Sequence, residues 1–254
     1  MKHRYFLLFV LLLTTAFYTK AQTTKQTTTV RQVWMAYMNQ TRLSEKWGIW
    51  TDFHLRTKDD FVKDLSLSII RLGGTYYFAT NTKLTAGYAY VNFFPTEGHA
   101  NISQPEHRIW QQLQWHTNYS RVRTMQWIRL EERFRHKIKN DDELADGYNF
   151  NYRLRYNLQL FIPLNKNKFA PKTFSWVVND EILLNFGKEI INNYFDQNRF
   201  FTGLAYHVND HDNFQFGYSN VFQQLAAGNR YRSIHVIRLF YFHNMNLRKK
   251  EKGQ

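Results

Sequence analysis

Residues 148–162 read YNFNYRLRYNLQLFI, and side chains of opposite polarity alternate along nearly the whole stretch. Aromatic or aliphatic side chains occupy every even-numbered position, whereas Asn, Arg and Gln occupy the odd-numbered positions from 149 to 159. Successive side chains of a β-strand point to opposite faces, so a strand would separate these two sets, whereas a helix would mix them. The stretch therefore predicts a strand with one apolar face and one polar face that carries arginines.

The same alternation recurs along the chain and predicts eleven strands. Clear examples are residues 47–56 and 213–223, in which apolar and polar side chains again take opposite faces. The predicted strands span residues 31–41, 47–56, 65–78, 84–93, 105–117, 123–136, 147–162, 173–185, 196–207, 213–223 and 231–242. Most of them reach the roughly 9–11 residues that a tilted strand needs to cross a bilayer.

The composition favours a barrel whose outer surface contacts lipid. Aromatic residues make up 18% of the chain, yet the mean hydropathy is −0.57. Only helices and closed barrels satisfy every backbone polar group in lipid, and no later stretch is apolar enough for a spanning helix. We therefore predict an all-β fold, a single up-and-down antiparallel transmembrane β-barrel. The alternative, a soluble β-sandwich or ligand-binding barrel, would need a polar outside and an apolar inside.

The lengths of the predicted connections distinguish the two ends of the barrel. Short turns follow the first, third, fifth and ninth strands, and longer polar loops follow the second, fourth, sixth, eighth and tenth. Periplasmic turns are short and outer loops are long, so the first strand would begin on the outer side. Because single-chain bacterial barrels usually have an even number of strands, we expect about twelve, with a short strand near residues 27–30, and ten as the next choice.

The N-terminus has the pattern of a secretory signal peptide. Lys2 and Arg4 are positive, residues 5–13 are apolar, and Ala21 offers a cleavage point. A membrane anchor is disfavoured because the apolar run is shorter than the ~20 residues of a spanning helix. The expected organisation is a signal peptide at 1–21, a polar N-terminal lead at 22–30, the barrel at 31–243 and a basic C-terminal tail at 244–254. The expected location is the bacterial outer membrane.

The net charge and the lack of cysteine limit the expected partners. The chain has a formal net charge of +14 and no cysteine, which excludes disulfides and thiolate metal sites. In an exported barrel, positive charge favours anionic lipid head groups or an anion-attracting lumen over nucleic acid. Expected partners are membrane lipids, including lipopolysaccharide, and the outer-membrane assembly machinery; we expect no cofactor and leave the oligomeric state open.

Four short motifs, taken in their order along the chain, resemble a known family. They are Glu106-His107-Arg108, Arg129-Leu130-Glu131-Glu132-Arg133, Asn179-Asp180-Glu181 and Phe195-Asp196-Gln197-Asn198-Arg199. Together they are similar to the domain-of-unknown-function 2490 family, over nearly the whole chain after residue 21. The resemblance implies an exported outer-membrane barrel, and it implies no activity.

The polar faces of the predicted strands carry the candidate functional residues. The predicted lumen-lining residues are Asp52, His54, Arg56, Glu106, Arg108, Arg129, Glu131, Arg133, Arg135, Arg153, Arg155, Glu181 and Arg199. Paired arginines and carboxylates would form a structural network that partly fills the barrel. The same residues could instead form a cationic constriction that selects anions, and Glu131 or Glu181 could transfer protons. The sequence is compatible with all three interpretations.

A lipid hydrolase is the main enzymatic alternative, beside a barrel that binds partners at its surface. The serines and histidines available for such an enzyme are Ser175, Ser219, His54, His116 and His235. A nucleophile needs a base within hydrogen-bond reach and a third group that orients this base, and no local motif brings these residues together. We therefore expect no enzymatic activity and no catalytic residue.

Three other clusters have simpler structural explanations. Residues 207–212 contain two histidines and two aspartates, but aspartate is common in turns for backbone reasons, so we expect no metal site. The acidic loop 141–146 could share a divalent cation with lipopolysaccharide, although an ordinary solvated loop is the simpler interpretation. Aromatic residues near strand ends suit the interfacial belts of a barrel better than a sugar-binding surface.

Overall fold

The computed structural model describes residues 24–58, 60–166 and 169–248, and these residues form eleven β-strands. The strands are β1 (Gln26–Arg42), β2 (Trp47–Lys58), β3 (Asp64–Ala79), β4 (Thr82–Phe93), β5 (Gln104–Asn118), β6 (Arg123–Ile138), β7 (Leu144–Pro163), β8 (Thr173–Phe186), β9 (Phe195–His207), β10 (Asp212–Gln224) and β11 (Arg230–Asn246). Each strand overlaps one of the eleven ranges predicted from the alternation of side chains. The expected signal peptide at 1–21 lies outside the described residues.

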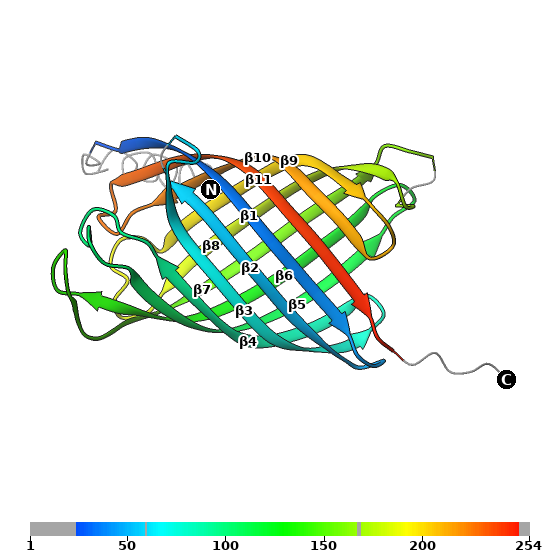
Figure 1. Ribbon diagram of the computed structural model, residues 1–254, viewed down its shortest axis with the longest axis horizontal. Coiled ribbons are helices and arrows are strands. Elements are labelled where there is room, and N and C mark those ends of the chain that lie inside the picture. The colour runs from blue at the N-terminus through cyan, green and yellow to red at the C-terminus, as the bar shows by residue number, and fades with distance from the viewer. Residues whose placement is uncertain (1–23, 59, 167–168, 249–254) are drawn as a thin grey trace, which may run out of the picture.

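The strands form one closed barrel in which every strand pairs with its neighbours in the sequence (Figure 1). These neighbouring pairs are antiparallel, whereas the closing pair, β1 with β11, is parallel. Along this seam, residues Gln26–Arg42 lie opposite Arg230–Asn246 without a break in register. Within residues 26–246, closure leaves none of the described strands with a free edge of unpaired backbone groups.

The parallel seam explains why the number of strands is odd. In an up-and-down barrel of eleven strands, the first and last strands run in the same direction, so they can close the sheet only as a parallel pair. The expectation of about twelve strands therefore exceeds the observed number by one. Residues 27–30 are not an additional strand but the start of β1, which pairs with β11.

Because β1 and β11 pair along their full lengths, the barrel begins earlier and ends later in the sequence than the composition predicted. β1 begins at Gln26 and β11 ends at Asn246. Part of the expected polar lead at 22–30 and part of the expected basic tail at 244–254 are therefore strand. Residues 26–30 and 244–246 form the strand ends at the two rims, where polar side chains are expected, and they pair along the seam through their backbones.

The barrel has two dissimilar ends. The short-turn end carries residues 43–46, 80–81, 119–122, 164–166, 169–172 and 208–211. The long-loop end carries residues 60–63, 94–103, 139–143, 187–194 and 225–229. β1 begins at the long-loop end, because Gln26 lies opposite Arg230, and β11 ends at the short-turn end. In Figure 1 the arrows of β1 and β11 run side by side toward the same end.

The wall of the barrel is apolar outside and largely polar inside. On β3, the outward Ile70 and Leu72 each expose 58% of their surface. On β7, Tyr156 is exposed whereas Arg153 and Arg155 are buried, as the alternation in residues 148–162 predicts. Among the described residues, no helix is long and apolar enough to span a membrane.

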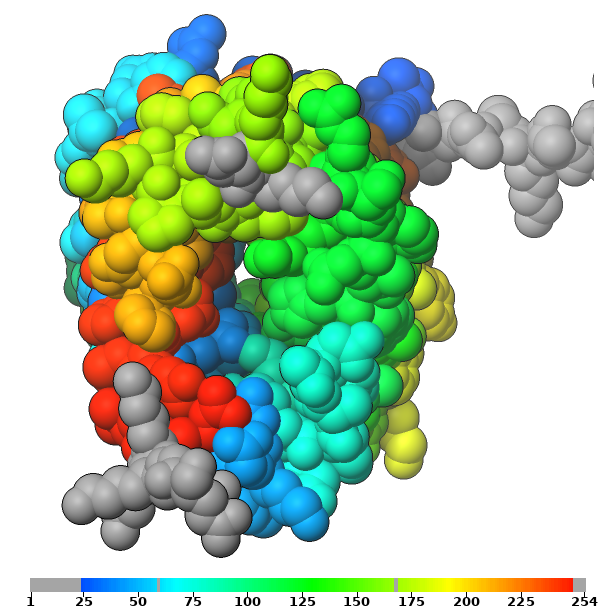
Figure 2. All heavy atoms as spheres, turned by 90° about the vertical axis from the view of Figure 1, so that its right-hand side faces the viewer, coloured from blue at the N-terminus to red at the C-terminus, as the bar shows by residue number. Residues whose placement is uncertain are grey.

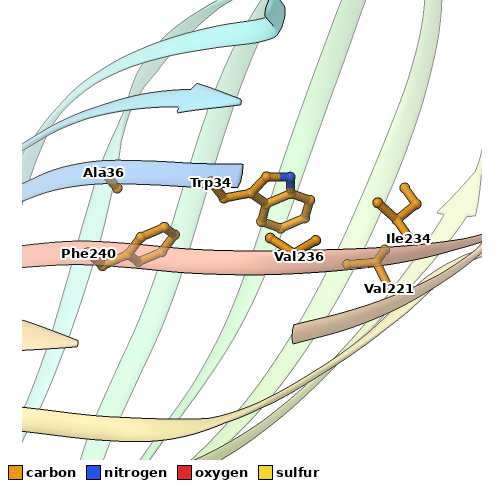
Figure 3. Packing of buried hydrophobic residues seen from close by; sticks show 6 residues of the cluster. All are labelled: Trp34, Ala36, Val221, Ile234, Val236 and Phe240. Carbon is orange, nitrogen blue, oxygen red and sulfur yellow. The ribbon is translucent and has the colours of Figure 1, made fainter. Parts of the chain in front are cut away.

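Part of the inner wall is nevertheless apolar. The seam cluster, shown in Figure 3, consists of Trp34, Ala36, Val221, Ile234, Val236 and Phe240 from β1, β10 and β11. A second cluster inside β2–β5 consists of Trp50, Ile69, Ala89, Val91 and Trp110. A third, smaller cluster consists of Val177, Phe201 and Ala205 on β8 and β9. The interior is therefore uneven: apolar clusters alternate with ion pairs, and most of the ion pairs lie on β5–β9.

Candidate functional site

The inward-facing side chains surround an elongated cavity of about 1600 Å³. Its lining includes Phe94 and Thr96 at the long-loop end and Asn209 and His211 at the short-turn end, so it reaches both ends of the barrel. Figure 2 looks along the barrel from the short-turn end and shows an opening between the strand ends. The chemistry of the interior depends on the ion pairs that the charged side chains around this cavity form.

Glu106 of β5 is the first centre of ion pairs. Its side chain has no exposed surface, and its two carboxylate oxygens accept hydrogen bonds from Arg133 Nε and Nη2, both at 3.0 Å. Arg135 Nε donates to the same carboxylate at 2.5 Å, and Arg108 also pairs with it. One negative charge is thus shared by three arginines of β5 and β6.

Glu131 of β6 is the second centre. Arg153 donates to its Oε2 from Nε at 2.9 Å and from Nη2 at 2.5 Å, and Arg155 Nη1 donates to Oε1 at 2.6 Å. Arg108 and Arg129 lie slightly farther from the carboxylate, at 3.7 and 3.8 Å. Because Arg108 contacts both Glu106 and Glu131, it joins the two centres.

Two more carboxylates extend this network to β8 and β9. Glu181 pairs with Arg155 and lies 3.5 Å from Arg199 Nη1. Asp196 accepts a hydrogen bond from Arg153 Nη1 at 3.0 Å. The ion pairs therefore run without interruption across the inside of β5–β9. Such burial of charge is tolerated because charge-assisted hydrogen bonds replace the lost water.

A separate centre lies at Asp52 of β2. Arg71 Nε is 2.8 and 3.0 Å from the two carboxylate oxygens, Trp50 Nε1 donates at 2.5 Å, and His54 Nε2 lies 3.0 Å away. Arg71 lies directly opposite Asp52 in the register of β2 and β3. Opposite charges in that position stabilise the pairing of the two strands.

The structure places all of the predicted lumen-lining residues inside the barrel. They are Asp52, His54, Arg56, Glu106, Arg108, Arg129, Glu131, Arg133, Arg135, Arg153, Arg155, Glu181 and Arg199. Asp52 and His54 belong to the smaller centre, and the residues from Glu106 onward belong to the network on β5–β9. Arg56 has no ion pair in either group among the described residues.

Three charged residues near the middle of the interior, Arg71, Asp196 and Arg238, were not among the predicted lumen-lining residues. Arg71 and Arg238 occupy inward positions of β3 and β11, so alternation within those strands carried a signal for them. The sequence of β9 carried no such signal for Asp196. It lies where the register of β8 and β9 shifts, between a residue opposite Leu183 and one opposite Leu184. Such a bulge turns an extra side chain out of the alternating pattern.

The described part of the interior carries more positive than negative charge around its middle. The arginines are Arg56, Arg71, Arg108, Arg129, Arg133, Arg135, Arg153, Arg155, Arg199 and Arg238, and the carboxylates are Asp52, Glu106, Glu131, Glu181 and Asp196. Ten arginines against five carboxylates leave an excess of five positive charges. Rings of arginine select anions in pores, so the arrangement can attract anions and repel cations.

Within the described ranges of the chain, no serine is paired with a histidine that a carboxylate orients. Ser175 Oγ lies 2.9 Å from Nε2 of His207, a pairing that the sequence analysis did not anticipate, but Ser175 has no exposed surface. Among the described residues, no carboxylate is paired with His207 to orient it. Ser219 Oγ instead donates to the Phe200 carbonyl at 2.6 Å, and His235 lies outside, bonded to a tyrosine.

The two acidic clusters have structural partners. No group of three or more potential metal ligands occurs among the described residues, and His211 Nδ1 lies 2.9 Å from the Asn244 carbonyl oxygen. In the acidic loop, Asp141 accepts hydrogen bonds from the backbone of Ala100 and Asn101. The loop after β6 is thereby tied to the loop after β4.

Aromatic side chains are packed together on the outside near both ends. Near the long-loop end, the ring of Phe150 lies 4.7 Å from that of Phe134. Near the short-turn end, Tyr241 stacks on Phe214 with a centroid distance of 4.6 Å, and Trp47 lies 5.0 Å from Tyr76. Exposed aliphatic side chains such as Leu72 lie between these two belts.

Comparison with known proteins identifies one family. The model of the family described as "Protein of unknown function (DUF2490)" matches residues 31–232, which is most of the barrel. No curated protein and no solved structure matches the chain significantly.

Proposed function

The chain belongs to this family of proteins of unknown function. Because membership in the family indicates no activity, we propose a function from the geometry of the barrel. The protein is a bacterial outer-membrane barrel that provides a narrow, anion-preferring passage for small solutes. The observation that carries the proposal is the cavity that reaches both ends of the barrel and is lined by an excess of arginine.

The distribution of outer side chains supports a location in a membrane. A soluble barrel would hide its apolar residues, whereas this barrel exposes Ile70, Leu72 and many other large apolar side chains. Two belts of aromatic residues flank this apolar surface, as expected at the two interfaces of a bilayer. A closed sheet also satisfies its own backbone hydrogen bonds, which lipid requires.

The interior supports a narrow passage with charge selectivity. Arg129 exposes only 3% of its surface and Arg133 only 6%, so long side chains fill much of the central section. A solute that crosses it passes close to guanidinium groups, which remain charged at any physiological pH. The closeness of fixed positive charge would favour small anions over cations of equal size.

Measurements of ionic current across planar lipid bilayers test this function. In a salt gradient, the purified barrel should give single-channel currents whose reversal potential indicates a preference for chloride over potassium. Arg129→Gln should weaken this preference, because Arg129 contacts Gln112 Oε1 at 2.9 and 2.6 Å and holds no carboxylate closer than 3.8 Å. Arg31→Gln, on the exposed outer part of β1, is the matched control and should change nothing.

Heat-modifiable migration on gels would first show that each variant is folded. Currents that prefer potassium, or a folded protein that passes no current, would refute the proposed passage. An equal effect of the Arg129 and Arg31 substitutions would show that the interior does not set the selectivity.

A further inference from the structure

Arg56 and Arg238, which both lie in the cavity wall, have no carboxylate partner among the described residues. The guanidinium carbon of Arg56 lies 3.6 Å from the centre of the Trp34 ring, and its buried Nε has no hydrogen-bond partner. Arg238 lies 4.1 Å from the rings of both Phe201 and Phe240. Its Nη2 has one hydrogen bond, to Gln215 at 3.3 Å, and its buried Nε has none. Both side chains line the cavity.

The strand register brings these arginines together. Trp34 of β1 lies directly opposite Arg56 of β2 and directly opposite Arg238 of β11. All three side chains line the cavity, so they sit side by side across the seam. The guanidinium of Arg199, from β9, lies 5.5 Å from the centre of the same Trp34 ring.

Arg199 is only partly neutralised. Its Nη1 lies 3.5 Å from Glu181, a carboxylate already paired with Arg155. Its Nε donates to Gln197 at 2.8 Å. We call Arg56, Arg199 and Arg238 the seam arginines. Arg56 and Arg199 lie over the Trp34 ring, and Arg238 extends from the position opposite Trp34 on β11. Glu181, the carboxylate near Arg199, is also paired with Arg155.

Aromatic rings hold these guanidinium groups in place but do not neutralise them. A ring face attracts a cation and fixes the plane of a guanidinium, leaving its N–H donors free at the edge. Arginine cannot release its proton to relieve the repulsion. Donors that are fixed, charged and unpaired are the features of a site that binds an oxyanion, because two N–H groups of a guanidinium match two oxygens.

We propose that the seam arginines bind a carboxylate or phosphate group inside the barrel. The site rests on the proposed anion passage and gives it a specific binding position at the β1–β11 seam. The seam cluster lies beside it, with Phe240 and Ile234 lining the same cavity. The bound group would supply the negative charge that the described residues do not provide there.

Calorimetric titration of the folded barrel in detergent, at low ionic strength, tests the site. Inorganic phosphate and acetate are the two probes, and at least one should bind saturably with a stoichiometry of one. Arg56→Gln and Arg238→Gln should each weaken that binding about tenfold or more, since each removes charge-assisted hydrogen bonds. Tighter binding of phosphate or of acetate shows which oxyanion the site prefers, and either result supports it.

Arg123→Gln is the matched control. Arg123 also lines the cavity and lies on an aromatic ring, 4.1 Å from the centre of Phe169, but it sits at the short-turn end. Its substitution should leave affinity within about twofold if the seam arginines form the site. Equal weakening by all three substitutions would indicate a diffuse field and would overturn the proposal, as would a lack of saturable binding of both probes.

The outcome can be separated from that of the proposed passage. Saturable binding without any current across a bilayer would support the site and refute the passage. Anion-selective current without saturable binding would support the passage and refute the binding site. Unchanged gel migration of Arg56→Gln and Arg238→Gln shows that their loss of affinity does not come from unfolding.

Discussion

Glu131 and Arg56 show how differently single charged residues are held inside this barrel. Glu131 is almost fully buried and lies within 4 Å of four arginines. Arg56 lies on an indole ring and has no carboxylate partner in the part of the chain that the structure describes. A buried charge is costly when its partner is removed, and a charge that already lacks a partner has no such pair to lose. The two residues should therefore respond in opposite ways to loss of charge.

Glu131→Gln should destabilise the barrel by about 3–5 kcal/mol, because Arg153 and Arg155 would lose their shared carboxylate. Urea unfolding in detergent micelles, followed by tryptophan fluorescence, measures the loss. Glu132→Gln is the matched control, because Glu132 points outward between Ile109 and Tyr152 and has no ion pair among the described residues. Arg56→Gln should leave stability unchanged or raise it. An equal loss in Glu131→Gln and Glu132→Gln would show that the network contributes little.

At the scale of strands, alternation of side chains was enough to locate all eleven strands and to assign their faces. Local alternation could not reveal how the barrel closes, because β1 and β11 are separated by nearly the whole chain. Parallel and antiparallel pairing also require the same alternation of side chains. Local alternation also could not place Asp196, which lies at a bulge, or the pairing of Ser175 with His207 across β8 and β9. Those features depend on register, which a single strand does not specify.

Two adjacent glycines of β3, Gly73 and Gly74, allow the packing on the inner face of the barrel wall to be tested. A Cβ atom on the inward Gly73 would lie 2.9 Å from the Ala86 carbonyl oxygen and 3.0 Å from Cζ2 of Trp110, whereas one on the outward Gly74 would meet nothing within 4 Å. Gly73→Ala should therefore displace Trp110 and destabilise the barrel by about 1–3 kcal/mol.

Gly74→Ala, the adjacent control, should be neutral or stabilise the barrel by up to about 1 kcal/mol. Thermal unfolding followed by near-ultraviolet circular dichroism would report both the stability and the packing of Trp110. Equal stability of the two variants would mean that the inner wall at β3 is loosely packed around this ring.

At the scale of the whole molecule, the parallel seam separates the two ends of the chain. In a barrel with an even number of strands, the first strand begins and the last strand ends at the same rim. Here β1 begins at the long-loop end and β11 ends at the short-turn end. If the proposed membrane location is correct and long loops face outward, the start of β1 lies outside the cell and the end of β11 lies in the periplasm.

Labelling of single cysteines in intact cells tests this orientation, and the chain has no cysteine of its own. Thr24→Cys, just before β1, and Ala227→Cys, in the loop between β10 and β11, should both react with a membrane-impermeant maleimide. Asp210→Cys, in the turn between β9 and β10, should react only after the outer membrane is permeabilised. All three positions are exposed, so a difference in labelling reports the side of the membrane. Labelling of Asp210→Cys alone would reverse the orientation, and labelling of Ala227→Cys without Thr24→Cys would contradict the parallel seam itself, because that seam requires the start of β1 to share a rim with the loop before β11.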